Sequence, residues 1–129
     1  MILHLIDTSI WIDFLRGSSN SRVRLLEGLL EEGEAHLCEI TYAEICFGAK
    51  DQRQFQKYSR HFADLPFLPL PSGWHLELSH MGHVLRTKGR KPYVADLLIA
   101  LVAIHHRAIL LTRDKDFDVY RDLFGLVLE

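Results

Sequence analysis

Apolar and polar positions along the chain form a pattern that predicts short strands alternating with helices. Apolar runs too short for helices predict buried strands at 2–6, 35–40, 108–111 and 126–128. Apolar residues at helical spacing predict helices around 10–15, 23–30, 41–50, 55–62, 72–88 and 93–104. Such alternation is typical of a parallel sheet with right-handed crossovers. We therefore expect an α/β fold, a three-layer α/β/α sandwich around a parallel sheet of four to five strands.

Local signals predict where several helices begin and end. Thr8 or Ser9 is a good N-cap for the first helix, and Ser72 for the helix that ends before Gly89. Gly33 is expected to end the second helix. The run 93–104 is hydrophobic on nearly all sides, which predicts a central buried helix. The three prolines in 65–71 predict an extended segment at a sheet edge.

Acidic residues fall at the ends of predicted strands or at the starts of the helices that follow. Asp7 and Asp114 come directly after strands, Glu44 lies in the first turn of a helix, and Asp96 lies near the start of the buried helix. Because the carboxyl ends of parallel strands share one edge, these side chains are expected to converge on one crevice. Three of them also have a structural explanation: Asp7 as a cap or in an Asx turn, Glu44 in a capping box with Thr41, and Asp96 at a helix dipole.

A cluster of carboxylates alone points to hard metal ions. Oxygen ligands suit Mg²⁺ or Mn²⁺, which keep several waters, activate water and stabilise charge on a phosphodiester. The sequence shows no evident cysteine or histidine nucleophile and no phosphate-binding loop of the G-x-x-x-x-G-K-[ST] type.

Composition then narrows the class of protein. With 129 residues, 48% hydrophobic and 25% charged, the chain has the size and balance of one globular domain covering 1–129. Its longest apolar run is too short to span a membrane, and no signal peptide is evident. The two cysteines, Cys38 and Cys46, indicate no disulfide framework, which fits a cytoplasmic location. The net charge of −2 disfavours a binder that depends on phosphate contacts alone, but not an enzyme that uses metal ions.

Basic residues gather around the predicted end of the fifth helix: Arg86, Lys88, Arg90 and Lys91. Cations near a helix C-terminus are favourable without any function. They also suit contacts with substrate phosphates beside Asp96. The sequence leaves both interpretations open.

Four ordered segments resemble the PIN-domain nucleases, and within them the VapC-type toxins of type II toxin–antitoxin pairs. They are L-I-D-T-S-I-W-I-D-F-L (5–15), I-T-Y-A-E-I-C-F-G-A (40–49), V-A-D-L-L-I-A (94–100) and L-L-T-R-D-K-D-F (110–117). The resemblance implies that Asp7, Glu44, Asp96 and Asp114 are the catalytic quartet. It implies Asp7, Asp96, Asp114 and Asp116 as metal ligands, with Ser9 and Thr112 as supporting hydroxyls.

The resemblance also implies an activity and partners. The chain is expected to be a single PIN domain, a Mg²⁺- or Mn²⁺-dependent endoribonuclease that hydrolyses RNA with metal-activated water. Its partners would be a cognate antitoxin, an RNA substrate and a second copy in a homodimer, with no membrane. We expect the antitoxin to place an Arg or Lys near Asp7 and Asp96 and to cover apolar surface around Trp11 and Phe14. The alternative for either aromatic residue, and the stronger expectation for Phe14, is a place in the core.

Two other functions are compatible with parts of the sequence. A metal-dependent phosphatase of small substrates would place an acid two positions after Asp7, where this chain has Ser9. A non-catalytic RNA or protein interaction module would have no need of all four acids.

Overall fold

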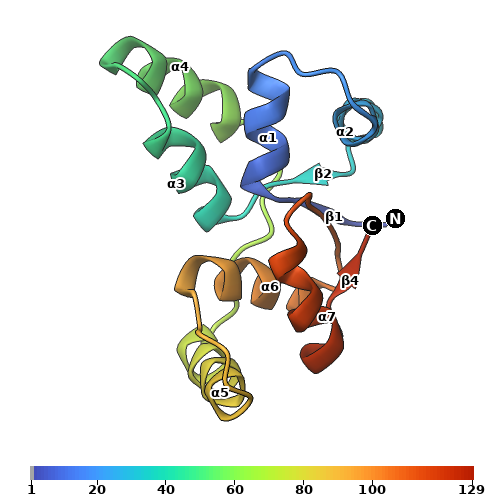
Figure 1. Ribbon diagram of the computed structural model, residues 1–129. Helices are drawn as coiled ribbons and strands as arrows, with labels where there is room; N and C mark the ends of the chain where they lie inside the picture. The colour runs from blue at the N-terminus through green and yellow to red at the C-terminus, as the bar shows by residue number, and fades with distance from the viewer. Residues whose placement is uncertain (1) are drawn as a thin grey trace.

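The computed structural model describes residues 2–129 and has an α/β architecture (Figure 1). In chain order the elements are β1 (His4–Ile6), α1 (Thr8–Leu15), α2 (Ser21–Glu32), β2 (Ala35–His36), α3 (Glu39–Phe47), α4 (Gln52–Ala63), α5 (Trp74–Thr87), α6 (Val94–His106), β3 (Ile109–Leu111), the 3-10 turn η1 (Lys115–Phe117), α7 (Asp118–Phe124) and β4 (Val127–Leu128). The strands form one parallel sheet in the order β2-β1-β3-β4, which confirms the expected parallel sheet.

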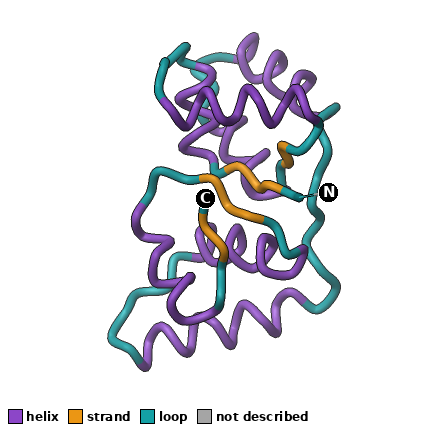
Figure 2. Tube along the Cα trace, turned by 90° about the vertical axis from the view of Figure 1, so that its right-hand side faces the viewer, coloured by secondary structure: helices purple, strands orange, loops and turns teal. Residues whose placement is uncertain are grey.

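Each face of the sheet is covered by its own hydrophobic core, so the expected three layers are present. Successive strand residues point to opposite faces. Leu5 and Leu110 therefore pack in the core that holds α5, α6 and α7, whereas Ile6 and Leu111 pack in the core that holds α1 to α4. Figure 2 shows the strands between these two groups of helices.

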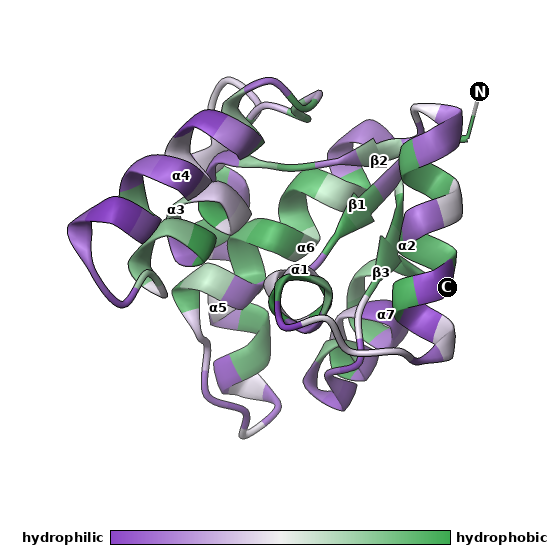
Figure 3. Cartoon of the chain, turned by 90° about the horizontal axis from the view of Figure 1, so that it is seen from above, coloured by the Kyte–Doolittle hydropathy of each residue, from purple (hydrophilic) through white to green (hydrophobic). Residues whose placement is uncertain are grey.

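Helix α6 is the central helix that its composition predicts. Its residues from Leu97 to Ala103 are all buried, and Figure 3 shows the helix coloured hydrophobic along most of its length. Its two ends reach solvent: Val94 in the first turn is 61% exposed, and His105 in the last turn is exposed. The N-terminal end is the one that carries an acidic side chain, Asp96. None of the described residues forms a helix with the length and hydropathy needed to cross a membrane.

Some local predictions were wrong. The strand expected at 35–40 ends at His36, because α3 already begins at Glu39 and Thr41 bonds back to the Cys38 backbone N–H at 2.9 Å. The N-caps are Asp7 for α1, in place of Thr8 or Ser9, and Gly73 for α5, in place of Ser72.

Other helix ends follow their predictions. Gly33 ends α2 in the left-handed conformation, at φ 71°, as expected. Gly89 directly follows Lys88, the C-cap of α5. The proline-containing segment is extended and touches the sheet edge through a single bridge between Leu37 and Phe67. Helix α7 was not predicted.

Candidate active site

Asp7 stands at the junction of β1 and α1, next to the end of β3. Its backbone N–H donates to the Leu111 carbonyl at 2.9 Å, so the sheet itself fixes its position. The side chain is 6% exposed, and its Oδ2 accepts hydrogen bonds from Ser9 Oγ and Thr112 Oγ1, each at 2.7 Å. Although Asp7 is the N-cap residue, its carboxylate makes no capping hydrogen bond. The capping explanation of this carboxylate is therefore wrong.

Glu44 is also free of the capping role that the sequence suggested. Because α3 begins at Glu39, Thr41 is the residue that bonds the Cys38 backbone, and Glu44 lies further along the helix. Its Oε1 accepts a hydrogen bond at 2.7 Å from Thr8 Oγ1 on α1. That contact joins residues 36 positions apart and turns the Glu44 carboxylate toward the start of α1.

Asp96 shows that the acids share one space. Partial burial in the first turn of α6 is the main cause that raises the pKa of Asp96 to about 6. The negative charges of Asp7, Asp114, Glu44 and Asp116, in that order, raise it further. Like charges have this effect only at short range. The structure thus brings together the acids that come from β1, α3, α6 and the turn after β3.

Asp114 and Asp116 belong to the turn that follows β3. The Asp114 N–H donates to Thr112 Oγ1 at 3.0 Å, and Asp114 Oδ1 accepts from the Asp116 N–H at 2.9 Å. Asp114 therefore caps η1 through Oδ1, and its other carboxylate oxygen takes no part in this capping hydrogen bond. Asp116 is exposed. The neighbouring cation, Arg113, is held away from the acids by Asp13, with its Nε 3.0 Å from Oδ2.

The donor set fits a hard divalent cation held through few protein ligands. All its side-chain donors are carboxylate or hydroxyl oxygens, and no Lys or Arg among the described residues forms an ion pair with any of the five acids. Within residues 2–129, however, no three His, Cys, Asp or Glu side chains are arranged as a ready cage. Mg²⁺ is commonly bound by one or two carboxylates and several waters, so a cage is not required.

The basic residues separate into two groups. Arg90 and Lys91 line a hollow that reaches Asp116, whereas Arg86 and Lys88 lie exposed at the end of α5 outside that lining. The same hollow contains Lys115, which the sequence analysis did not single out.

The structure adds Thr8 and Tyr120 to the residues around the acids. Thr8 looked like a cap, and Tyr120 lies on the unpredicted α7, so neither gave a sequence signal. Burial, followed by the charges of Asp96, Asp116 and Asp114, raises the pKa of Tyr120 to about 12, which keeps its hydroxyl protonated.

Trp11 does not line a surface. It is 1% exposed and packs edge-on against Phe62 at a centroid distance of 5.2 Å. The expectation that a partner protein covers Trp11 was wrong, because the indole belongs to the core beneath α1. Phe14, which contacts Trp11, is only partly buried.

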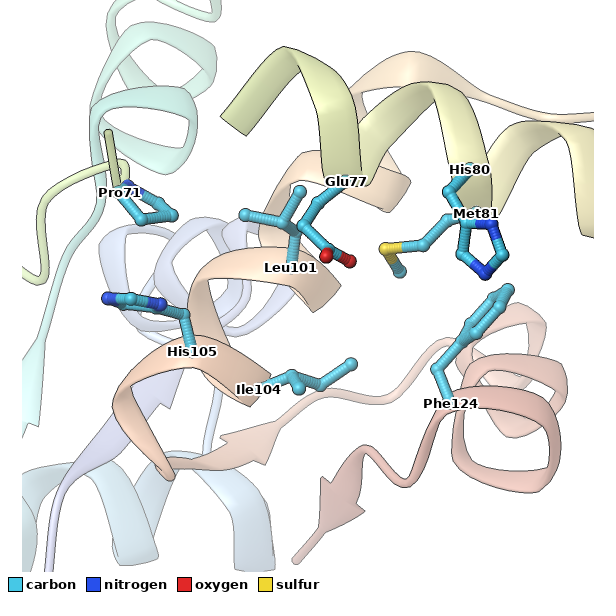
Figure 4. A pocket seen from close by; sticks show the side chains of 8 residues that line it. All are labelled: Pro71, Glu77, His80, Met81, Leu101, Ile104, His105 and Phe124. Carbon is cyan, nitrogen blue, oxygen red and sulfur yellow. The ribbon is translucent and has the colours of Figure 1, made fainter. Parts of the chain in front are cut away.

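A second hollow, of about 430 Å³, lies away from the acids between α5, α6 and α7 (Figure 4). Its lining includes Glu77, His80 and His105 beside Met81 and Phe124, and none of the candidate site residues.

Comparison with known proteins gives one consistent result. The family model of the PIN domain matches residues 4–123. The VapC ribonuclease Mb1587 of Mycobacterium bovis and Ribonuclease VapC11 of Mycobacterium tuberculosis are each 31% identical over 132 residues, covering 95% of this chain and 94% of the relative.

Solved structures show the same fold. VapBC2 from Rickettsia felis, bound to a DNA fragment of its promoter, matches with a TM-score of 0.80 at 23% identity and covers 99% of this chain and 98% of that chain. VapBC-1 from nontypeable Haemophilus influenzae matches with a TM-score of 0.76 at 21% identity, covering 99% and 97%.

Proposed function

Because this chain belongs to the PIN-domain family, and within it to the VapC ribonucleases, we propose that it is a divalent-metal-dependent endoribonuclease that acts as the toxin of a toxin–antitoxin pair. The observation that carries the proposal is the acid cluster itself. Four carboxylates from other parts of the fold act on the carboxylate of Asp96, and none of the five is neutralised by an ion pair among the described residues. Such repulsion is costly unless a cation relieves it.

In this proposal Mg²⁺ or Mn²⁺ is held among Asp7, Asp96, Asp114 and Asp116, with one or two of these carboxylates as direct ligands and waters completing the set. When bound, the ion would activate water and stabilise the charge that develops on the phosphodiester.

The chain's own residues orient the site. Ser9 and Thr112 both donate to Asp7 Oδ2, which leaves Oδ1 as the free oxygen of that carboxylate. Thr8 does the same for Glu44 by occupying Oε1, so that Oε2 is available to accept a proton from water. Glu44 is thus the candidate general base.

We propose that an antitoxin blocks this crevice with an Arg or Lys. The VapBC complexes of Rickettsia felis and Haemophilus influenzae, which share the fold, support a protein partner. Arg presents a bidentate fork to carboxylates, and the crevice offers several carboxylates without a cation. A homodimer is proposed on the same family basis.

The test is incubation of the purified chain with total RNA, with Mg²⁺ or with EDTA. We expect cleavage only with Mg²⁺, and almost none for Asp7→Asn, which keeps a side-chain oxygen that can accept from Ser9 and Thr112. A matched control is Glu27→Gln on the exposed face of α2, which should cleave like wild type.

A second readout is independent of activity. Mg²⁺ that binds only the folded protein should stabilise it by about 2.7 kcal/mol at a hundred times the dissociation constant. The stabilisation appears as a rise in melting temperature on adding Mg²⁺, and this rise should be smaller for Asp96→Asn than for wild type. Full cleavage by Asp7→Asn, or a melting temperature that neither Mg²⁺ nor Mn²⁺ changes, would contradict the proposal.

A further inference from the structure

A hollow of about 400 Å³ adjoins the acid cluster on the side of Asp116. We call it the Tyr93 hollow. One wall is the turn between α5 and α6, with Arg90, Lys91 and Tyr93, and the other is η1 and the start of α7. Its lining also includes Lys115, Asp116, Asp118, Tyr120 and Asp122.

The charges of the hollow leave an excess of free cations. Asp118 and Asp122 both pair with Arg121, at 3.7 Å and 3.0 Å. Arg90, Lys91 and Lys115, by contrast, have no carboxylate within 4.0 Å among residues 2–129. Three cations that line one hollow and have no carboxylate within ion-pair distance favour an anionic ligand, since each gains by neutralisation. The only acid of the lining outside an ion pair is Asp116, at the edge shared with the metal site.

Tyr93 supplies an aromatic ring in the same place. Its side chain is 54% exposed although it precedes the most buried helix of the protein. Lys91 Nζ lies 5.5 Å from the ring centroid, so a cation and an aromatic ring stand side by side. Tyr93 is also the N-cap residue of α6, three positions before Asp96, which places it at the rim of the acid cluster.

Tyr120 connects the two regions. It is 3% exposed and lines the Tyr93 hollow, and the negative charges of Asp96 and Asp116 help to raise its pKa. Because Asp116 belongs both to this lining and to the acid cluster, the hollow and the cluster are neighbouring parts of one surface. An extended anion bound in the hollow would continue directly into the acids.

We propose that the Tyr93 hollow binds the nucleotide next to the cleaved phosphodiester of a single-stranded RNA, with Tyr93 stacking on the base and Arg90, Lys91 and Lys115 contacting phosphates. The inference rests on the proposed ribonuclease function and adds a substrate subsite to it. Single-stranded RNA combines a flat apolar base with a phosphate at every step, and cations interleaved with an exposed aromatic ring match that combination.

The experiment measures binding separately from cleavage. Binding of a fluorescein-labelled oligoadenylate RNA to the full chain is followed by fluorescence anisotropy in EDTA, over a range of salt concentrations. Tyr93→Ala is expected to weaken binding by roughly 5- to 150-fold, and Tyr93→Phe to restore it, because stacking needs the ring and not the hydroxyl.

The cations are tested in the same assay. Lys115→Gln should reduce the slope of log affinity against log salt by about 0.7, the value for one phosphate contact on a single strand. The matched control is Arg107→Gln, which removes an exposed cation at the opposite end of α6 and should leave the slope unchanged.

The outcomes separate this inference from the proposed function. If the wild-type chain cleaves RNA in Mg²⁺ but Tyr93→Ala binds as wild type does, the Tyr93 hollow is not the subsite and the ribonuclease proposal stands. A wild-type chain that binds no oligoadenylate, or a Tyr93→Phe variant as weak as Tyr93→Ala, also overturns the inference. Melting temperatures equal to wild type show that the variants are folded, as expected for an exposed side chain.

Discussion

Replacing Asp96 by Asn should stabilise the metal-free protein at neutral pH. The wild-type carboxylate is half-buried and close to four other acids, so its ionised form is disfavoured in the folded state. An amide of nearly the same shape carries no charge. The Asp96 side chain also makes no hydrogen bond with residues 2–129 that the amide would lose.

The size of the effect follows from the pKa of Asp96, which burial and neighbouring acids raise from 3.8 to about 6. At about 1.4 kcal/mol for each pKa unit, the full ionisation penalty is about 3 kcal/mol. Because the carboxylate still meets solvent, we expect about half of that, or about 1.5 kcal/mol. For a domain of 129 residues this corresponds to a melting temperature higher by about 4 to 6 °C.

The pH dependence has a definite sign. A carboxyl whose pKa is raised on folding takes up protons more readily in the folded state, so the wild type is favoured at low pH. This contribution is lost as pH rises from about 3.8 toward about 6. The advantage of Asp96→Asn should therefore grow between pH 4 and pH 7.

The assay is thermal unfolding in EDTA at both pH values, with the exposed Glu27→Gln as the control that should shift little at either. An Asp96→Asn variant that melts below wild type at pH 7, or a difference that does not change with pH, would refute the reasoning.

Two further predictions concern single contacts. Thr112→Val should lower RNA cleavage by about 10- to 100-fold, because the Thr112 hydroxyl donates to Asp7 Oδ2 and accepts from the Asp114 N–H. The control Thr87→Val, which removes a hydroxyl at the end of α5, should cleave RNA like wild type. Equal activity of the two variants would rule out the positioning role of Thr112. Gly33→Ala should destabilise the fold by about 1 to 2 kcal/mol through backbone strain alone, since φ is 71° and a Cβ there would clash with no atom within 4 Å. Gly28→Ala inside α2 should instead stabilise the fold by about 0.5 to 1 kcal/mol. Chemical unfolding measures both variants, and the opposite order would contradict the strain argument.

The parts of the fold that depend on local pattern could be predicted from the sequence. The apolar runs mark the strands because a buried parallel strand needs both faces apolar, as Leu5 and Ile6 show by entering different cores. The same reasoning placed Asp7 and Asp114 at one edge of the sheet. The convergence of the acids then followed from the topology of parallel sheets.

The parts of the fold and of the site that depend on long-range contacts could not be predicted from the sequence. The Thr8–Glu44 hydrogen bond joins residues 36 positions apart, and either residue alone looked like a helix cap. The strand at 35–40 was overestimated because apolar residues also suit the buried start of α3, where the Thr41 bond to Cys38 decides the backbone. Helix α7 has only seven residues, too few for periodicity to stand out, so Tyr120 and the wall of the Tyr93 hollow were missed.

The position of β1 in the middle of the sheet has a consequence for how this protein is made. Strand β1 pairs on one side with β3, where His4 faces Ile109 and Ile6 faces Leu111. A ribosome must therefore produce every element between β1 and β3 before this pairing can form. The site around Asp7 is completed equally late, since Thr112, which bonds both Asp7 and the Asp114 N–H, directly follows β3. A nascent chain lacks the assembled acid cluster, and for an enzyme that cuts RNA this order of assembly delays the activity until β3 and the turn after it have been translated.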